Sequence, residues 1–459
     1  MDDPFSAEPA LDPKKYYFLY IGEIKALGLN RFMRGPMEIR SGKSADFIAV
    51  VPDVLARYPG GNIVVVNSAA REARERTGRL HNVRISGGMF AREVSRDRRV
   101  LALVDRLVNA QGELFINMFE SRPELAFADG NQVKLLGPDP DLALTLNSKL
   151  RQYGMAMELG IPVPSGGVSR SLDEAVEIAE GFFADGRKTF VTGEYSAAGA
   201  NSIVASNAAE IRSRFKSTNG NLLVTHFVEH EYDPTVLGIV AGPEDVYIAS
   251  IADQNIEGTR FKGSTYPTVL PDRCVKDLKE MTRELGQHLG ALGYRGAFGC
   301  DFIVDQGGRI CFIEINARKQ GTTMETTLTM KHHLPGHPYF PELEYYAVVD
   351  GKFPEGVLEM DSRGDGLCWG TYNLKVPGDV EVLSDLPVPM DQAEFFARVA
   401  DGSAGENFIV VDHVGAGVLL HSGGFLGRVI AASTSADKVR EALKDGVEMV
   451  AETCGNELI

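Results

Sequence analysis

The sequence has few cysteines, no excess of basic residues and no long apolar segment, and each lack argues against a class of protein. Its five cysteines show no CxxC spacing among 459 residues, which fits buried thiols in a reducing compartment better than a disulfide framework. The net charge of -16 argues against general affinity for nucleic acid or an anionic membrane, because both need a dominant basic surface. No apolar run approaches the roughly 20 residues that span a bilayer. We therefore expect a cytoplasmic protein that binds neither nucleic acid nor membrane.

A dinucleotide fingerprint is also missing from the N-terminal segment. Strand-like stretches such as KYYFLYIG and GGNIVVVNSA alternate with helical ones over residues 15–137. This alternation predicts an α/β domain with a mostly parallel sheet, but without GxGxxG it does not support a dinucleotide site. Residues 1–14 are acidic and rich in proline, unlike a signal peptide. We predict that they form a disordered leader.

Two further segments of the chain are separated by changes in sequence pattern. The segment LGPDPD opens a unit over residues 138–335 in which helical and strand patterns mix. The prolines of LPGHPYFPE then mark a linker, and residues 336–459 are typical of a small α/β domain. Length alone suggests roughly two to four domains. The predicted fold class is therefore α/β and α+β, arranged as a multidomain chain.

The most informative stretch is GCDFIVDQGGRICFIEINAR, residues 299–318. Two apolar runs flank a Gly-Gly pair, which predicts a β-hairpin with a two-residue turn at residues 307–308. Counting back along both strands places Asp301 opposite Glu314, although like charges that face each other destabilise a sheet. Asn316 shares their face because side chains alternate with a period of two. A hard cation such as Mg²⁺, which takes oxygen ligands, resolves the repulsion; the alternative is a polar face exposed to water.

A second cluster, KHHLPGH, contains His332, His333 and His337. Neighbouring histidines can bind zinc, but adjacent positions point apart and no cysteine or further ligand lies at a supporting distance. A loop that lines an acceptor pocket is the better interpretation.

These segments follow one another in an informative order. A helix with a lysine precedes a GIPVP turn, a strand with a Gly/Ala/Ser loop follows, then an apolar hinge strand, and last the DFIVD and EINAR motifs. This order resembles the ATP-grasp superfamily, in which two α+β subdomains close on ATP. The resemblance covers roughly residues 138–325 and implies a Rossmann-like pre-ATP-grasp domain before them. The three-part layout and the length are similar to peptide ligases of the pheganomycin type, which join a carboxylate to a peptide amine.

The resemblance implies roles for the residues of the hairpin. Asp301, Glu314 and Asn316 would bind Mg²⁺, and the metal would bridge the phosphates of ATP. Arg318 would hold the γ-phosphoryl group or the developing oxyanion, where negative charge accumulates. The alternative for Arg318 is a surface arginine that pairs with a nearby acid.

The resemblance also implies a nucleotide site. Its residues would be Lys149, Thr192, Ser196, Ala197, Ala198, Gly199, His226, Phe227, Val228 and Glu231. Lys149 would reach the phosphates, although a lone lysine on a helix is more often solvated. The small residues, together with Ala200, would cover the triphosphate, because backbone N–H groups can then approach phosphate oxygens. Residues 226–228 would form the hinge beneath adenine, and Glu231 would bind the ribose, with Asp233 as a close rival.

Two positions depart from the family pattern. Members commonly carry a second lysine on the strand before the glycine loop, and Thr192 stands there in this chain. Lys188, at the start of that strand, is a candidate substitute. The hinge begins with Thr225 where a glutamate is common. Losing a cation near the α-phosphate should weaken nucleotide binding without stopping the chemistry.

The function that the resemblance implies is an ATP-dependent carboxylate–amine ligase. It would activate a small-molecule carboxylate as an acyl phosphate, and an amine or peptide would then displace phosphate to form an amide. The pheganomycin-type resemblance implies amino-acid or peptide substrates, a role in antibiotic biosynthesis, and a homodimer. Two alternatives stay open: an ATP-grasp kinase that stops after phosphoryl transfer, and a non-catalytic nucleotide-binding regulatory protein.

Overall fold

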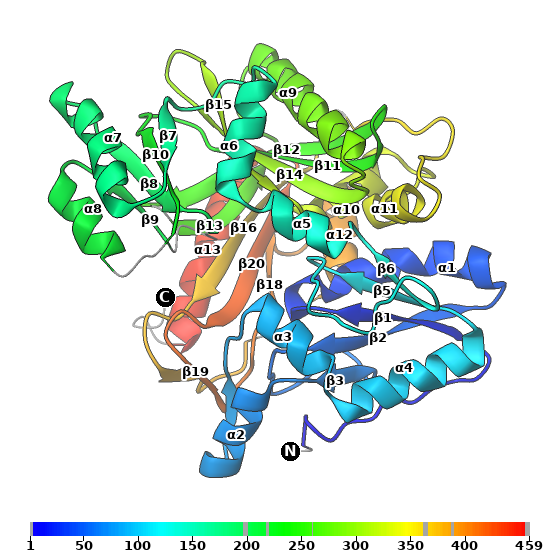
Figure 1. The fold of residues 1–459 in the computed structure, drawn as a ribbon. Coiled ribbons are helices and arrows are strands. Elements are labelled where there is room, and N and C mark those ends of the chain that lie inside the picture. Colours follow the sequence, from blue (N-terminus) through cyan, green and yellow to red (C-terminus); the bar gives the residue numbers. More distant parts are fainter. Residues whose placement is uncertain are drawn as a thin grey trace.

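The computed structural model describes residues 3–195, 201–216, 220–258, 260–360, 366–386 and 390–454. Within these residues the chain builds a parallel sheet, two antiparallel sheets and a small mixed sheet, with helices packed around them (Figure 1). The predicted fold class, α/β and α+β in a multidomain arrangement, is confirmed.

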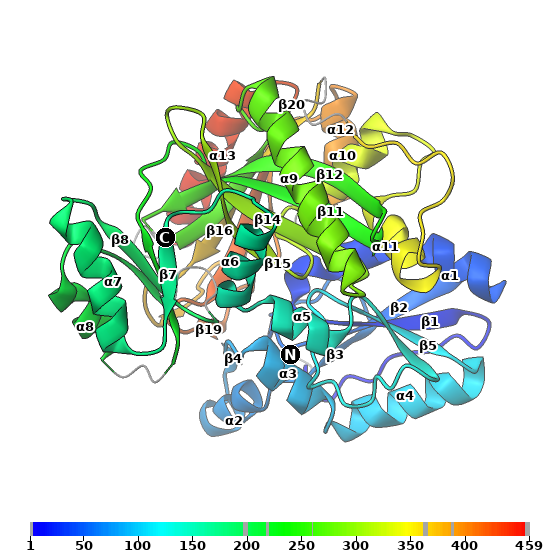
Figure 2. The same ribbon diagram turned by 45° about the horizontal axis from the view of Figure 1, so that its top comes forward.

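The N-terminal segment folds into the parallel sheet that the alternation predicts. Its strand order is β3-β2-β1-β5-β6, and every neighbouring pair is parallel. The strands are β1 (Tyr16–Ile21), β2 (Ala45–Val51), β3 (Ile63–Val65), β5 (Leu114–Met118) and β6 (Val133–Leu136). The helices are η1 (Ile24–Met33), α1 (Arg34–Ser41), α2 (Ser68–Thr77), α3 (Gly87–Val94) and α4 (Arg98–Gln111). Helices α1 and α4 cover opposite faces of the sheet, each against one set of alternating β1 side chains (Figures 1 and 2).

Residues 3–14 lie against this part of the molecule. Phe5 is 7% exposed and belongs to the largest apolar core, and the Arg99 guanidinium donates to its carbonyl oxygen. The backbone N–H of Asp12 donates to the Tyr17 hydroxyl oxygen at 3.0 Å. The prediction of a disordered leader does not match this placement. It rested on polar composition, whereas one buried aromatic side chain and a few hydrogen bonds hold the segment.

The next segment forms a small antiparallel sheet with the order β7-β10-β8-β9. Its strands are β7 (Gly166–Ser169), β8 (Thr189–Gly193), β9 (Ser202–Ala205) and β10 (Leu222–His226). Helices α7 (Leu172–Ala184) and α8 (Ala208–Phe215) pack on the outer face of the sheet, which projects from the rest of the molecule (Figures 1 and 2). Helices α5 (Pro140–Leu146) and α6 (Lys149–Glu158) precede it in the chain, and α6 rises from the centre of Figure 1 beside the projecting sheet.

A long antiparallel sheet crosses the middle of the molecule with the order β15-β14-β11-β12-β13-β16-β20-β18. Its strands are β11 (Pro234–Gly242), β12 (Asp245–Glu257), β13 (Arg260–Tyr266), β14 (Gly296–Val304), β15 (Ile310–Asn316), β16 (Cys368–Lys375), β18 (Phe408–Val411) and β20 (Phe425–Ser433). Helix α9 (Asp272–Ala291) packs on β11 and β12. Because β13 pairs with β16, residues on both sides of position 335 share this sheet, and the domain boundaries stay a prediction.

A small mixed sheet joins the N-terminal α/β segment to the C-terminal segment. Strand β19 (Val418–Leu420) pairs in parallel with β4 (Leu80–Asn82) and antiparallel with β17 (Val380–Glu381). The remaining helices are α10 (Thr323–His333), α11 (Phe340–Val349), α12 (Gln392–Ala400) and α13 (Ala436–Cys454). The C-terminal segment therefore reaches down to the edge of the parallel sheet (Figure 1).

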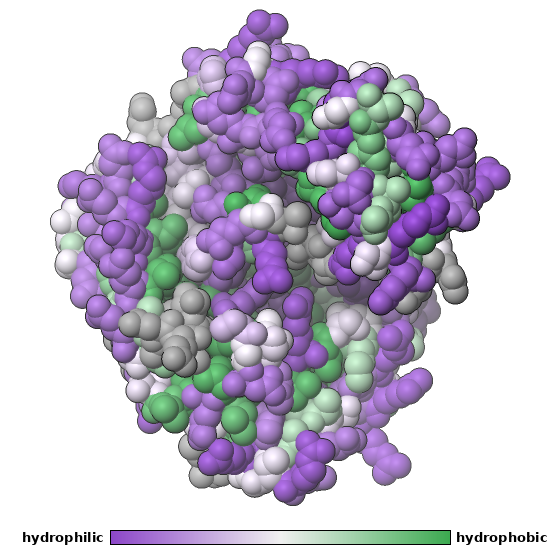
Figure 3. All heavy atoms as spheres, turned by 90° about the vertical axis from the view of Figure 1, so that its left-hand side faces the viewer, coloured by the Kyte–Doolittle hydropathy of each residue, from purple (hydrophilic) through white to green (hydrophobic). Residues whose placement is uncertain are grey.

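The surface agrees with the composition. The face in Figure 3 is covered mainly by hydrophilic residues, with smaller hydrophobic areas between them. In the described part of the chain, the helices that are long enough to cross a bilayer are too polar to do so.

Candidate active site

The acidic hairpin forms and contains the predicted carboxylate pair, but the strand pairs next to its turn are shifted by one residue. Asp301 on β14 pairs directly with Glu314 on β15, which confirms the predicted pair. The turn is shifted by one residue, because Asp305 faces Arg309 rather than Gln306 facing it. A β-bulge at Ile313 then restores the alignment, since Phe302 pairs with Phe312 while Asp301 pairs with Glu314. The two one-residue deviations cancel before the strands reach the carboxylates.

Asp301 is held by a set of hydrogen bonds. The Thr235 hydroxyl donates to one carboxylate oxygen at 2.6 Å, and the Asn316 amide donates to the other at 3.0 Å. The Gln320 amide donates to Thr235 Oγ1 at 2.7 Å and to Asp301 at 3.3 Å. Burial raises the pKa of Asp301, and the bonds from Thr235 and Asn316 oppose that rise. The carboxylate is therefore fixed in direction before any ligand arrives.

Lys149 supplies the cation that the facing carboxylates need in this structure. It is the first residue of α6, which Ser148 caps, and its ammonium forms an ion pair with Glu314. Its backbone N–H donates to the carbonyl of Glu194, beyond β8, at 3.0 Å. Burial lowers the pKa of Lys149 to about 8, with Asp301 opposing the change and Arg318 adding to it. The lysine is thus part of the site and not a solvated side chain.

Arg318 lies directly beyond the acidic strand. Its guanidinium donates to the Asn316 amide oxygen at 2.8 Å and lies 5.7 Å from the centre of the Phe119 ring. The next residue, Lys319, is 3% exposed and forms an ion pair with Glu344 at 2.8 Å. Lys319 thereby fixes the backbone beside Arg318.

These residues surround a cavity of about 400 Å³ between the small and the long antiparallel sheets. Of the predicted site residues, the cavity is lined by Lys149, Thr192, His226, Phe227, Val228, Asp301, Glu314, Asn316 and Arg318. Apolar side chains such as Phe190, Leu223 and Ile256 form another part of its wall. The cavity thus combines an apolar part with a charged end.

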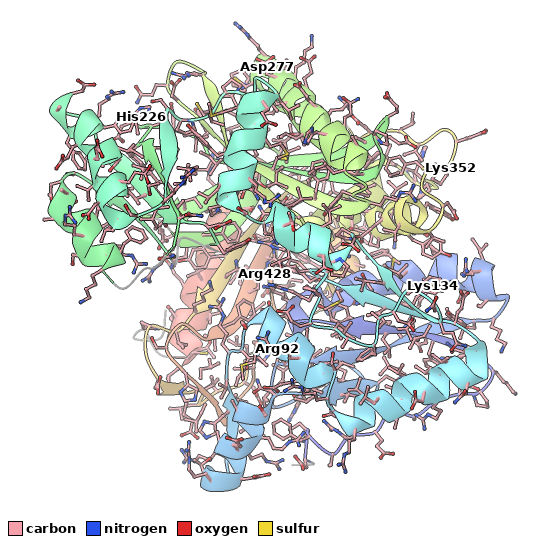
Figure 4. All side chains as sticks on the ribbon, in the orientation of Figure 1. Arg92, Lys134, His226, Asp277, Lys352 and Arg428 are labelled. Atoms are coloured by element: carbon pink, nitrogen blue, oxygen red, sulfur yellow. The ribbon has the colours of Figure 1, made fainter. Side chains whose placement is uncertain are left out.

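The hinge at the end of β10 offers fewer backbone groups than expected. The N–H of His226 donates to the Ser165 carbonyl at 2.8 Å, and the N–H of Phe227 donates to the Lys188 carbonyl at 2.9 Å. Burial lowers the pKa of His226, and the nearby charges of Arg187 and Arg309 add to this effect. Figure 4 shows His226 on the projecting sheet, on the side that faces the rest of the molecule.

One predicted site residue lies elsewhere. Glu231 is not among the residues that line the cavity, and its carboxylate accepts a hydrogen bond from the Tyr232 hydroxyl at 3.1 Å. Asp233, the rival two residues later, does line it and accepts from His230 at 3.0 Å. That bond raises the pKa of His230. The spacing left this choice open because the hinge has no regular strand to set its period. Of the two carboxylates Asp233 lines the cavity, and the ribose role stays a prediction.

The described residues expected near the triphosphate have no common location in the structure. Ser196, Ala197, Ala198, Gly199 and Ala200 lie outside the described residues. Thr192 is buried and lines the cavity, and its hydroxyl donates to the Asn201 carbonyl at 3.3 Å. Lys188, the candidate substitute, is 3.6 Å from Glu229 and does not line the cavity.

The histidine cluster lies apart from the site. His332 and His333 end α10, with their rings 5.1 Å apart, and His337 follows in the next loop. None of the three lines the cavity, so the expectation that this loop lines a pocket is not met there. In the described part of the chain, no group of three or more histidine, cysteine, aspartate or glutamate side chains is arranged to hold a metal.

Two residues that sequence reasoning missed complete the Asp301 environment. Thr235 and Gln320 come from the start of β11 and from the segment after β15, and no local pattern marks them. Gly299 was the available signal, because a Cβ atom there would collide with the Gln320 side chain. A glycine inside a strand often marks such a close approach.

Part of the chain matches a known protein family. Residues 146–322 match the model of the ATP-grasp domain. This segment is therefore similar to the ATP-grasp domain, and the structure that surrounds the cavity has the corresponding fold. Carboxyaminoimidazole ribonucleotide synthase from Aspergillus clavatus, solved with ATP, is similar to the whole chain with a TM-score of 0.59 and 12% identity, covering 96% of this chain and 100% of that one. The biotin carboxylase domain of 2-oxoglutarate carboxylase from Hydrogenobacter thermophilus, solved with MgADP and bicarbonate, has a TM-score of 0.64 and 15% identity, covering 94% and 89%.

Curated relatives of this chain include ligases. L-propargylglycine–L-glutamate ligase of Streptantibioticus cattleyicolor is 33% identical over 100 residues, 22% of this chain. The butirosin acyl-carrier protein–L-glutamate ligase of Niallia circulans is 26% identical over 57% of this chain, and the carbamoyl phosphate synthase large chain of Gemmatimonas aurantiaca is 25% identical over 63%. The matched segments span 20%, 60% and 26% of these relatives. The resemblance to ATP-grasp carboxylate–amine ligases is thereby supported.

Proposed function

We propose that this protein is an ATP-dependent carboxylate–amine ligase that binds ATP in the cavity between its two antiparallel sheets. The observation that carries the proposal is the charged end of that cavity, where Lys149, Asp301, Glu314, Asn316 and Arg318 converge. Its volume of about 400 Å³ is suited to a small-molecule ligand. The apolar wall is suited to adenine, and the charged end to phosphates and a reacting carboxylate.

The donor set fits Mg²⁺. Asp301 and Glu314 offer carboxylate oxygens across the hairpin, and the Asn316 amide oxygen retains a lone pair beside its bond from Arg318. Oxygen ligands with one or two carboxylates, completed by substrate phosphates, are the usual environment of this ion. When bound, Mg²⁺ supplies charge neutralisation at the phosphate oxygens.

The chain's own residues would do the rest. A substrate carboxylate oxygen attacks the γ-phosphorus, the bond to the β,γ-bridging oxygen breaks, and ADP leaves with an acyl phosphate formed. The amine nitrogen then attacks the acyl carbon, loses a proton, and phosphate leaves. Lys149 would turn from Glu314 to the phosphates, and the Arg318 guanidinium would stabilise the charge that develops on the transferred group and on the tetrahedral oxyanion.

The names of two relatives suggest the substrate class. Both contain L-glutamate as one partner of a ligation, so we infer an amino acid or peptide as at least one substrate. The role in antibiotic biosynthesis, the pheganomycin-type resemblance and the homodimer stay predictions, and the dimer is tested by light scattering on the purified chain. Asp233 replaces Glu231 as our candidate for the ribose hydroxyls.

The test is hydroxylamine trapping with ATP, Mg²⁺ and pooled amino acids. The wild-type chain should produce a hydroxamate, Glu314→Gln should not, and Glu280→Gln, on the exposed face of α9, should match wild type. ATP consumption without hydroxamate would favour the kinase alternative. Nucleotide binding without turnover under any pool would favour the non-catalytic alternative, for which Thr192 and Thr225 are the best support.

A further inference from the structure

A second cavity, of about 110 Å³, lies where the parallel sheet meets the C-terminal segment. Its wall is formed by the loops that follow β1 and β2, by residues 82–85 after β4, by Lys375 at the end of β16, and by residues 423–425 at the start of β20. The loops at the carboxyl ends of parallel strands are where open α/β sheets bind ligands. Figure 1 shows the lower ends of β16 and β20 approaching this edge.

The charges around this cavity favour an anion. Lys25, Arg84 and Lys375 all line it, although the chain as a whole carries a net charge of -16. Lys25 forms an ion pair with Glu23, whereas in the described part of the chain neither Arg84 nor Lys375 has an ion-pair partner. Burial lowers the pKa of Lys375, and Arg84 and Lys25 add to this effect, which is consistent with cations gathered in a small space.

The acidic lining does not cancel this excess. Asp53 accepts a hydrogen bond from the Ile24 N–H at 2.7 Å. Burial, with the nearby charge of Glu23, raises the pKa of Asp53 to about 7, so near neutral pH it is partly protonated. Three cations therefore stand beside two carboxylates: Glu23, which forms its ion pair with Lys25, and Asp53, which is partly neutral.

A single aromatic ring connects this cavity to the active site. The Lys25 ammonium lies 5.4 Å from the centre of the Phe119 ring, and the Arg318 guanidinium lies 5.7 Å from the same centre. Arg318 lines the larger cavity, and Lys25 lines the smaller one. The linings of the two cavities therefore approach each other at Phe119.

We propose that the smaller cavity binds an anionic group of the second substrate between Arg84 and Lys375, while the reacting amine of that substrate faces Arg318. This inference rests on the proposed function. The carboxylate that reacts is consumed at the charged end of the larger cavity, so an anion held beyond Phe119 is an additional group. A carboxylate of an amino acid or short peptide and a phosphate share the required chemistry, and we commit to the carboxylate.

The experiment compares acceptors in steady-state ligation. Free amino acids and short peptides are assayed against the corresponding C-terminal amides, with phosphoethanolamine as the phosphate arm. Wild type should prefer the free carboxylates. Arg84→Gln and Lys375→Gln should each raise the KM for the free acid about tenfold or more, the usual effect of losing a charged hydrogen bond, and should erase the preference over the amide. Arg106→Gln and Lys352→Gln, at exposed positions, are the matched controls (Lys352 is labelled in Figure 4).

The outcomes separate the anion site from the proposed ligase function. Hydroxamate formation with an unchanged preference in both variants would overturn the anion site and leave the ligase intact. Preference for phosphoethanolamine would replace the carboxylate by a phosphate. If wild type forms no hydroxamate, the proposed function fails, and thermal shift with glutamate and with inorganic phosphate tests the site alone. Stabilisation of wild type that disappears in Arg84→Gln would support anion binding, and equal shifts in both would refute it.

Discussion

The Lys319–Glu344 ion pair provides the sharpest test of how the active-site end of the molecule is held together. Both side chains are 3% exposed and their charged atoms lie 2.8 Å apart. The ammonium also donates to the Asn117 side chain at 3.1 Å and to the Met118 carbonyl at 2.9 Å, at the end of β5. Lys319, the neighbour of Arg318 in the chain, therefore contacts both the parallel sheet and α11.

Replacing Lys319 by methionine should cost about 3–5 kcal/mol in the free energy of unfolding, the usual loss when one partner of a buried pair is removed. The loss arises because the Glu344 carboxylate would stay buried without its cation. The Ala297 N–H, which donates to it at 3.3 Å, would still be in contact with it. Urea unfolding followed by the fluorescence of Trp369, the one tryptophan in the sequence, measures the change. Trp369 is fully buried on β16 and stacks on Tyr266, so unfolding of the long sheet changes its environment.

The double variant Lys319→Met/Glu344→Leu is the control. Removing both charges leaves no uncompensated ion, so it should recover most of the loss. A loss below about 1 kcal/mol in the single variant, the size expected for an exposed pair, would refute the reasoning. Equal losses in the single and the double variant would show that packing, and not the buried charge, determines the effect.

Three further predictions concern the site and its surroundings. Glu314→Gln should lower the affinity for Mg²⁺ in the presence of ATP by at least about tenfold, and unchanged affinity by calorimetry would contradict its role as a ligand. Gly299→Ala should displace the Gln320 side chain and cost roughly 1–3 kcal/mol, whereas Gly307→Ala in the exposed turn should cost less. Asp412 has a pKa raised to about 7, mainly by burial, so its contribution to stability is present below pH 4 and is lost as the pH rises through 7. Asp412→Asn, which also suits the positive φ of 57° at this residue, should therefore stabilise the chain at pH 8 by up to about 4 kcal/mol, because a shift of about three pKa units corresponds to about 1.4 kcal/mol per unit, and should flatten that pH dependence.

Local pattern was sufficient for a large part of the site. The alternation of apolar and polar residues, together with the Gly-Gly pair, predicts the hairpin and the pairing of Asp301 with Glu314. The predicted pair is correct because two deviations cancel: the turn has three residues instead of two, and Ile313 forms a bulge. The alternation of side chains predicts neither of them. The order of motifs was sufficient to bring Lys149, Thr192 and residues 226–228 to one cavity.

Other features could be decided only by the tertiary structure. Glu231 and Asp233 differ by two positions in an irregular segment, and only the path of the chain into β11 puts Asp233 on the wall. The partners of Asp301, the Lys319–Glu344 pair and the smaller cavity each join segments that are far apart in the sequence. Periodicity reports which face a side chain occupies along its own strand or helix. It does not report which distant segment packs against that face, because that depends on how complete elements pack together.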